Sequence, residues 1–293
     1  MGGEEEFVGP VLLAHNLRKN DGRLQVPSID GWLASEKLDG YRALWTGKRF
    51  VSRTGKTFSA PDWLIDRMPC DMPLDGEFWL GRGNFERCGM FRRTSWKKVE
   101  EDWLNVEYKV FDAPTLDMPF SERLQRAATK LKNLDFSAVA EHYETEKEMH
   151  PVSVLAHHPV KNIEELEHLM EKLVAEGAEG VMVRDPDSAY VGKRSRTLLK
   201  LKPAHDAEAM IIGYEEGKGK YTGLLGAFIC RPLTHVETED NSIDFKMSGM
   251  TDEIRNNYLE THPPQTIVTY GYTEKTVRGK PRFPRYLRKY EQM

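Results

Sequence analysis

The chain has 293 residues, with 42 basic and 46 acidic side chains, a net charge of −4 and 39% hydrophobic residues. This composition is typical of a globular protein, and at roughly 150 residues per domain it predicts two domains. No apolar run approaches the ~20 residues of a membrane-spanning helix, and the acidic start lacks a signal-peptide core. We therefore expect no membrane partner and an intracellular chain. If a leader was removed, the periplasm is the alternative.

The cysteines exclude two common architectures. Cys70, Cys88 and Cys230 are odd in number and far apart in the sequence. This spacing excludes a Cys-x-x-Cys zinc site and a dense disulfide framework, and it favours a reducing compartment.

Short apolar segments separated by turn residues predict strands in the first two thirds of the chain, after an irregular stretch over residues 1–30. They cover residues 32–34, 43–45, 49–52, 74–80 and 106–111. Two amphipathic helices are also predicted. Ser121 is placed to cap the first, and Asn162, with Glu165 three residues later and Gly177 at the end, caps the second. The apolar face of the first helix consists of Leu124, Ala127, Ala128, Leu131 and Leu134.

The last third has a different pattern. Thr251 is placed to cap a helix over 252–258, between the third and fourth of five predicted strands. These strands cover residues 209–214, 225–231, 242–248, 266–272 and 283–288. Five strands with a helix in that position match the order of an OB-fold barrel. We expect two domains, over residues 1–203 and 204–293.

Two stretches are locally basic although the whole chain is not. From Arg82 to Lys98 there are six bases and one acid, interleaved with aromatic residues, and from Lys275 to Lys289 there are seven bases and no acid. Basic stretches with aromatics favour contact with a nucleic-acid backbone, and the alternative is a solvated charged face. The candidate DNA contacts are Arg82, Arg92, Arg93, Lys97 and Lys98 in the first stretch and Arg282, Arg285 and Arg288 in the second.

A lysine motif follows the first predicted strand. It reads Glu36-Lys37-Leu38-Asp39-Gly40-Tyr41-Arg42. A lysine amine is a nucleophile only when neutral, so nearby cations or burial must lower its pKa. An arginine five residues later suits bidentate binding of a phosphate or carboxylate. The alternative interpretation is an exposed charged turn.

Further segments accompany this motif in a fixed order. They are residues 52–56, 74–78, 108–112, 179–184 and 198–202. Together the six segments resemble the motif set of the covalent nucleotidyltransferases, and within them an ATP-dependent DNA ligase. Residues 79–85 and 281–288 are similar to the minimal Lig E type. The resemblance implies an α+β fold, with a nucleotidyltransferase (ATP-grasp-like ligase) domain followed by a C-terminal OB-fold β-barrel.

The resemblance also implies roles in binding ATP. Lys37 becomes the lysyl-AMP, flanked by Glu36, Leu38 and Arg42. Glu77 contacts the ribose, and Phe111 stacks on adenine. Lys200 and Lys202 contact the α-phosphate, and their alternation on a strand points both to one face, where their charge lowers the pKa of Lys37. Glu77 and Glu179 are the candidate ligands of Mg²⁺, which Mn²⁺ can replace.

The same resemblance implies a nicked duplex as the substrate. Arg53 matches a contact to the 5′-phosphate of the nick, and Arg184 and Arg194 are further phosphate candidates. We assign no role to His157 and His158, which we interpret as a surface pair. The implied reaction seals 5′-phosphate/3′-OH nicks, carried out by a monomer.

Three features are expected to set this chain apart within the family. We expect no separate N-terminal DNA-binding domain, and the connection over residues 232–241 is too short and acidic for a latch hairpin across the duplex. The ending Arg288-Lys289-Tyr290-Glu291 departs from the common Arg-x-Asp-Lys. Alternatives are an RNA ligase, an mRNA-capping guanylyltransferase and a non-catalytic nick-binding protein. The absence of zinc-finger cysteines argues against an NAD-dependent ligase.

Overall fold

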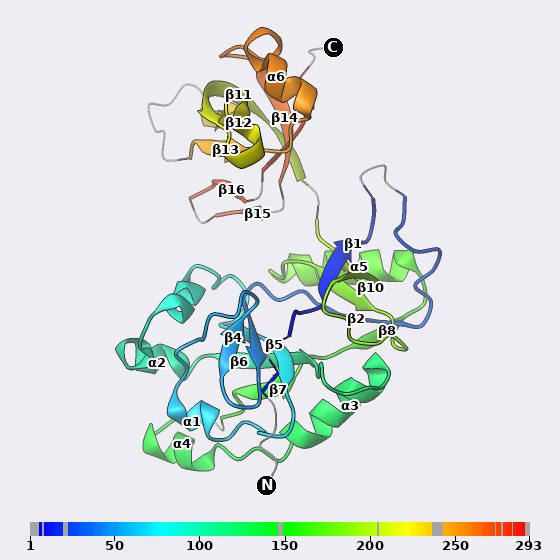
Figure 1. Ribbon diagram of the computed structural model, residues 1–293, viewed down its shortest axis with the longest axis vertical. Helices are drawn as coiled ribbons and strands as arrows, with labels where there is room; N and C mark the ends of the chain where they lie inside the picture. Colours follow the sequence, from blue (N-terminus) through cyan, green and yellow to red (C-terminus); the bar gives the residue numbers. More distant parts are fainter. Residues whose placement is uncertain are drawn as a thin grey trace. The chain divides into compact units, whose positions relative to one another are not determined.

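The computed structural model describes the chain in nine segments, and it divides into two compact units, Met1–Leu201 and Lys202–Met293 (Figure 1). The described residues are 6–7, 9–19, 23–145, 149–203, 205–235, 243–272, 274–276, 278–282 and 284–290. None of the helices in these segments is long and apolar enough to cross a membrane.

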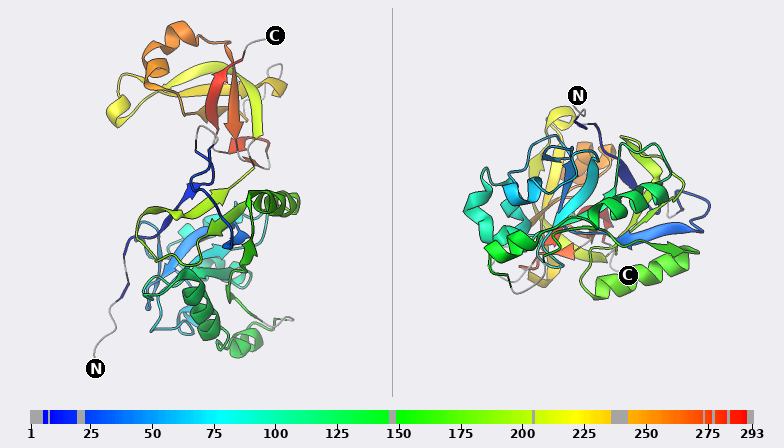
Figure 2. Two further views of the ribbon diagram at one scale, coloured as in Figure 1. Left: turned by 90° about the vertical axis from the view of Figure 1, so that its right-hand side faces the viewer. Right: turned by 90° about the horizontal axis from the view of Figure 1, so that it is seen from below.

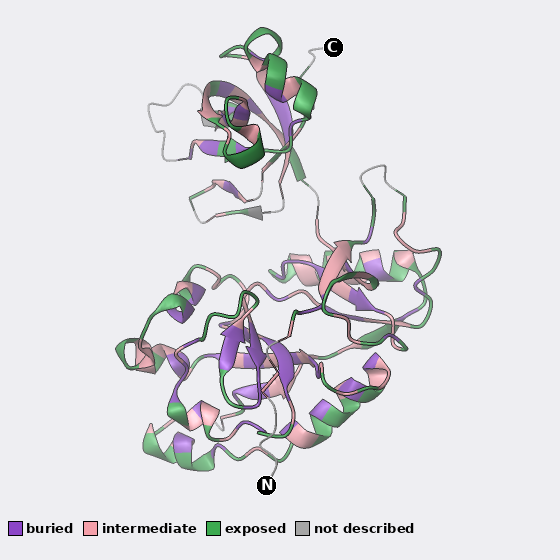
Figure 3. Cartoon of the chain, viewed as in Figure 1, coloured by how far each residue is buried: buried purple, intermediate pink, exposed green. Residues whose placement is uncertain are grey.

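The first sheet of unit 1 has the order β4-β3-β5-β6-β7, with the last pair parallel. Its strands are β3 (Tyr41–Trp45), β4 (Phe50–Ser52), β5 (Leu74–Trp79), β6 (Glu107–Asp112) and β7 (Val152–Val154). Along β6 buried and partly exposed residues alternate, as expected where one face of a strand meets the core. That core is aromatic: Phe78 packs on Phe50, Phe91 and Trp103. Figure 3 shows these strands as the most buried part of the unit.

The second sheet of unit 1 has the order β1-β10-β9-β2-β8, with β1 and β10 parallel. Its strands are β1 (Leu13–Asn16), β2 (Trp32–Glu36), β8 (His158–Val160), β9 (Val181–Arg184) and β10 (Arg194–Leu201). Helix α5 (Ile163–Ala175) packs on it through Leu166 (Figure 2). The predicted cap is confirmed, since Asn162 accepts a hydrogen bond from the Glu165 backbone at 2.8 Å.

The other helices of unit 1 are short, apart from α3. They are α1 (Asp62–Ile65), α2 (Glu100–Trp103), α3 (Phe120–Leu131) and α4 (Ser137–His142), with 3₁₀ turns at Arg87–Arg92 and Trp96–Val99. The predicted cap of α3 is wrong. The helix begins at Phe120 after Pro119, and the Ser121 backbone N–H donates to the Pro186 carbonyl, so Ser121 lies inside the first turn.

Unit 2 is the OB-fold barrel that the sequence predicts. Its sheet has the order β13-β12-β11-β14-β17, and a bridge between Ser248 and Arg285 joins the first strand to the last. Thr251 caps helix α6 (Asp252–Thr261), which lies between β13 and β14 as expected. The strands are β11 (His205–Glu216), β12 (Leu225–Pro232), β13 (Phe245–Met247), β14 (Ile267–Tyr272) and β17 (Arg285–Lys289).

Smaller elements complete unit 2. They are 3₁₀ turns at Gly219–Tyr221 and Leu233–His235 and a ribbon of β15 (Glu274–Lys275) and β16 (Pro281–Arg282). Most of the connection that we expect to lack a latch, residues 236–242, lies outside the described residues.

A buried ion pair joins α3 to the end of β6. Arg123 is 0% exposed and Asp112 2%. The guanidinium donates to both carboxylate oxygens of Asp112, at 2.6 and 3.0 Å, and also to the carbonyls of Met118 and Ser188. Because Arg123 and Asp112 are both buried, removing the Arg123 charge leaves the Asp112 carboxylate with only the longer ion pair to Arg184, at 3.7 Å.

We expect Arg123→Met to lower the free energy of unfolding by about 3–5 kcal/mol, because the buried Asp112 carboxylate loses its bidentate partner and keeps only Arg184, at 3.7 Å. Lys130→Met is the matched control on the same helix. The Lys130 ion pair with Asp71 is exposed, and such pairs contribute less than about 1 kcal/mol. Denaturant unfolding of both variants measures the difference, and equal losses would contradict this account.

Candidate active site

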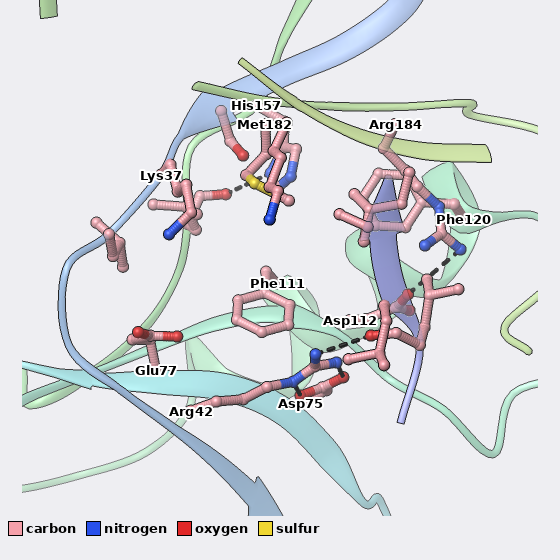
Figure 4. Close-up of a pocket in the computed structure, with 18 of the residues that line it drawn as sticks. Lys37, Arg42, Asp75, Glu77, Phe111, Asp112, Phe120, His157, Met182 and Arg184 are labelled. Atoms are coloured by element: carbon pink, nitrogen blue, oxygen red, sulfur yellow. Dashed lines mark hydrogen bonds and ion pairs between the residues drawn. The ribbon is translucent and has the colours of Figure 1, made fainter. Parts of the chain in front are cut away.

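One cavity of about 290 Å³ is lined by strands from both sheets of unit 1 (Figure 4). Residues far apart in sequence meet there. The predicted site residues that line it are Glu36, Lys37, Leu38, Arg42, Arg53, Glu77, Phe111, Arg184, Arg194 and Lys200. A pocket of this size, lined by charged side chains as well as by apolar ones such as Leu12, Phe111 and Met182, suits a small charged ligand.

Lys37 lies at the end of β2, where the chain turns toward β3. Its backbone N–H donates to the Gly180 carbonyl at 2.9 Å, and its ammonium pairs with the Glu179 carboxylate. The turn requires a glycine, because a Cβ at Gly40 would lie 2.2 Å from the carbonyl oxygen of Phe78. The hydrogen bond to Gly180 and the close contact at Gly40 therefore fix the backbone at Lys37 and after it.

Arg42 is held from several sides below the cavity. Its guanidinium donates to both oxygens of Asp75, at 2.9 and 2.5 Å, and to the Leu12 carbonyl at 2.7 Å. Tyr190 donates to the same Asp75 carboxylate, and the guanidinium lies 5.4 Å from the Phe111 ring centroid. These contacts fix Arg42 in the cavity wall beside Phe111, and its contact with ATP stays a prediction.

Glu77 lies on β5 beside the lysine motif and accepts a hydrogen bond from the Gly40 backbone at 3.1 Å. Burial raises the pKa of its carboxyl to about 7, against the nearby charges of Lys37 and Arg42, which lower it. Among the described residues, no group of three or more His, Cys, Asp or Glu side chains is placed to hold a metal ion.

The predicted basic contacts separate into those inside and those outside the cavity. Lys200 lines it, and burial followed by the charges of Lys37 and Arg194 lowers the pKa of Lys200. Strand β10 ends at Leu201, so Lys202 follows the strand and does not line the cavity. The prediction that Lys200 and Lys202 alternate on one strand is therefore wrong, because only Lys200 lies on β10.

Two arginines predicted to contact DNA are engaged within the protein. Arg184 is 3% exposed and donates to Ser188 and to the Ala189 carbonyl, and burial lowers its pKa to about 10. Arg82 donates to both oxygens of Glu36, each at 2.9 Å, and pairs with Glu176. In this structure the two side chains bind residues in the walls of the site, and their contacts to DNA stay predictions.

The remaining basic candidates are solvent-exposed on the two units. In unit 1 they are Arg53, Arg92, Arg93, Lys97, Lys98 and Arg194, and in unit 2 they are Arg285 and Arg288, with Arg282 partly exposed. Arg194 also donates to the Ala14 carbonyl.

Sequence reasoning missed several residues of the site. His157, Met182 and Tyr190 line the cavity, although we interpreted His157 as part of a surface pair. His157 lies between the end of β7 and the start of β8. Its two neighbouring strands are too short for a pattern to predict them, so no signal in the sequence marked this position.

Both units match known protein families. Residues 12–202 match a family model described as ATP dependent DNA ligase domain, and residues 216–289 match DNA ligase OB-like domain. The fold and the cavity thus define a nucleotidyltransferase of the ligase class.

Particular relatives narrow the family. A DNA ligase of Haemophilus influenzae is 33% identical over 262 residues, covering 89% of this chain and 87% of that protein. A DNA ligase of Thermococcus onnurineus is 28% identical over 227 residues, but the match covers only 37% of that longer protein. A solved structure described as "DNA binding with a minimal scaffold: Structure-function analysis of Lig E DNA ligases" covers 97% of this chain at 28% identity, with a TM-score of 0.78. The chain belongs to the ATP-dependent DNA ligases, and it is of the minimal Lig E type.

The raised pKa of Glu77 predicts that the free energy of unfolding depends on pH. Between pH 4.5 and about 7 the folded chain keeps a proton on Glu77 that the unfolded chain releases, so the free energy of unfolding falls as pH rises through this window. Glu77→Gln keeps an acceptor for Gly40 and removes the titration. We expect the variant to exceed the wild type by on the order of 3 kcal/mol above pH 7 and to approach it near pH 4.5.

Denaturant unfolding across this pH range measures the difference. Glu122→Gln, at an exposed position on α3, is the control and should unfold with the pH dependence of the wild type. A Glu77→Gln variant with an unchanged pH profile would show that Glu77 is not buried as an acid.

Proposed function

We propose that this ligase seals 5′-phosphate/3′-OH nicks in duplex DNA as a monomer, through a lysyl-AMP on Lys37 and a DNA-adenylate. One observation carries the proposal. Lys37, Glu77, Phe111 and Lys200 come from four separate segments and line one cavity within a single chain. Nucleophile, carboxylate, aromatic wall and second cation are the groups that an adenylation site requires.

In the first step the Lys37 amine attacks the α-phosphorus of ATP, a P–N bond forms, and the bond to pyrophosphate breaks. The amine must first lose a proton, which passes to water. The Glu179 carboxylate favours the charged lysine, whereas the Lys200 ammonium favours the neutral one. Lys37 therefore becomes nucleophilic when it leaves Glu179 and keeps Lys200 as its neighbour, and we assign the α-phosphate contact to Lys200 and not to Lys202.

Two carboxylates of the site also fit a divalent cation. Glu77 and Glu179 supply hard oxygen donors, and Mg²⁺ uses one or two protein carboxylates together with water and substrate phosphates. Such a cation, or Mn²⁺ in its place, would neutralise phosphate charge. Two carboxylates suffice for that coordination, so the residues present fit the group.

The remaining walls orient the nucleotide. We assign adenine stacking to the Phe111 ring and the ribose hydroxyls to Glu77. Glu36 and Leu38 flank Lys37 at the cavity wall, and Arg42 acts by holding β3, β5 and the Leu12 backbone together under Phe111.

The later steps need the nick. AMP passes from Lys37 to the 5′-phosphate, and the 3′-hydroxyl then displaces AMP as the phosphodiester forms. We assign Arg53, which is exposed yet lines the cavity, to the 5′-phosphate, with Arg194 as a second phosphate contact. The exposed bases over residues 92–98 and Arg282, Arg285 and Arg288 would bind the phosphate backbone of the duplex, with no latch.

Lys37→Arg tests the nucleophile. The guanidinium keeps the positive charge and a partner for Glu179, but it stays protonated and forms no phosphoramidate. Incubation with α-labelled ATP should give an acid-labile label on the wild type and only background on the variant. GTP should not label either protein.

Lys48→Arg is the matched control, since Lys48 is an exposed lysine in the turn after β3, and it should label like the wild type. The Lys37→Arg variant should still close a nick that already carries AMP, because that step needs no lysine. Acid-labile label on Lys37→Arg would remove Lys37 from the proposal.

Neutralising the exposed bases of the first unit tests DNA binding. Changing Arg92, Arg93, Lys97 and Lys98 together to glutamine should weaken binding to a nicked duplex and reduce the salt slope by up to about four, because each phosphate contact releases about one counter-ion. Lysine adenylation should persist. Binding measured at several salt concentrations gives the slope.

The control carries the same change in net charge elsewhere. It replaces four exposed lysines of the same unit, Lys48, Lys132, Lys161 and Lys172, by glutamine. If both quadruple variants lose the same slope, the effect is one of overall charge and the assigned surface is wrong.

A further inference from the structure

Arg82 links the two sheets of unit 1, yet the proposed function gives it no task. Strand β5 of the first sheet ends at Trp79, and the chain turns at Gly81, whose φ of +87° favours glycine. After this turn the Arg82 guanidinium reaches the second sheet and donates to both carboxylate oxygens of Glu36, each at 2.9 Å. Glu36 is the last residue of β2 and directly precedes Lys37.

The same guanidinium also binds the segment on the other side of Lys37. Its Nη1 donates to the Glu176 carboxylate at 2.8 Å and to the Glu176 carbonyl at 3.4 Å, at the C-terminus of α5, where a cation is favourable. Glu179 follows three residues later and pairs with the Lys37 ammonium. The carbonyl of Gly180 accepts from the Lys37 backbone. Arg82 therefore holds both chain segments that position Lys37.

This arrangement suits a residue that fixes geometry. An isolated surface ion pair contributes little, but a bidentate pair shared with a second carboxylate holds the donor in one orientation. The side chains of Arg82 and Glu36 are only 29% and 16% exposed. Nucleophilic attack needs the reacting atoms about 3–3.5 Å apart, and a misplacement of about 1 Å can cost about 100-fold in rate. A clamp on both sides of Lys37 therefore acts on the rate of its attack.

The contacts of Arg82 leave it no direct part in binding the nucleotide. It does not line the cavity, so its effect on the reaction passes through the segments that it holds. Its Nε, Nη1 and Nη2 are all engaged with Glu36 and Glu176, so a DNA phosphate would have to displace a carboxylate before Arg82 could bind it.

We propose that Arg82 is a positioning residue for lysine adenylation, which holds Glu36 and Glu176 so that the Lys37 amine meets the α-phosphorus of ATP. The inference rests on the proposed function, because it needs Lys37 as the nucleophile. It assigns Arg82 to the steps in which Lys37 gains and loses AMP. It gives Arg82 no part in binding the duplex or in the final step, from which the lysine is absent.

Arg82→Gln tests the proposal, because one neutral amide cannot hold both carboxylates. Labelling with α-labelled ATP over a range of ATP concentrations separates rate from binding. The adenylation rate at saturating ATP should fall by about 10- to 100-fold. The ATP concentration that gives half the maximal rate should stay within about twofold of the wild type, because Arg82 lies outside the cavity.

Two further measurements separate positioning from a general loss of structure and from a DNA contact. Sealing of a nick that already carries AMP should stay within about twofold of the wild type. The salt slope of nick binding should be unchanged, whereas loss of one phosphate contact would lower it by about one. Arg87→Gln is the matched control, since Arg87 lies in the same basic stretch and pairs with Asp102 at the surface. It should match the wild type in every assay.

Three results for Arg82→Gln would overturn the inference while leaving the proposed function intact. They are labelling at the wild-type rate, an equal loss of rate in adenylation and in sealing of the pre-adenylated nick, and a salt slope lower by about one. A wild-type chain whose lysine is labelled by no nucleotide would overturn both the inference and the proposed function.

Discussion

The bidentate pair between Arg42 and Asp75 is the interaction on which the site depends. It joins β3 to β5 in one sheet, and through the Leu12 carbonyl it reaches the segment that enters β1 in the other sheet. Tyr190 donates to the same carboxylate and accepts from the Leu12 N–H. Asp75 is fully buried, and these donors satisfy its carboxylate oxygens. Arg42, Asp75 and Tyr190 all line the cavity, so the network forms part of its wall.

Burial also changes the pKa values of side chains that line the cavity. Burial disfavours the ionised forms of Glu77 and Lys200, and the two groups respond in opposite directions, the carboxyl with a raised pKa and the ammonium with a lowered one. Lys37 pairs with the Glu179 carboxylate, and its charge is one of the causes that lower the pKa of Lys200.

Much of the fold could be predicted because its signals are local. Asn162 and Thr251 cap helices in the structure as they do in the sequence pattern, and the five strands of the OB-fold appear in the expected order. What the pattern missed depends on partners distant in sequence. Strand β1 forms because it pairs with β10, which lies near the other end of the first unit's sequence. Strands β7 and β8 have only three residues each. Such elements form through tertiary contacts, which no short window reveals.

The same limit applies to the site. An arginine can bind a phosphate at the surface or a carboxylate within the protein, and the sequence alone does not say which applies to Arg82 and Arg184. Only the fold shows that Glu36 and Glu176 lie within reach of Arg82, and Asp112 within reach of Arg184. The lysine motif was easier to interpret because its constraint is steric and local. Gly40 passes so close to the Phe78 carbonyl that no side chain fits, and this contact places Lys37 where the strand ends.

The division of labour between the units follows from which residues enclose the cavity. All of its lining residues lie in unit 1, from Leu12 to Lys200. Unit 2 has its own core, in which Phe228, Phe245 and Tyr270 pack between the strands of the barrel. In the proposed function, lysine adenylation is therefore a property of the first unit's two sheets. The exposed bases on β17 line no part of this cavity, and in that proposal they would bind the charged backbone of DNA.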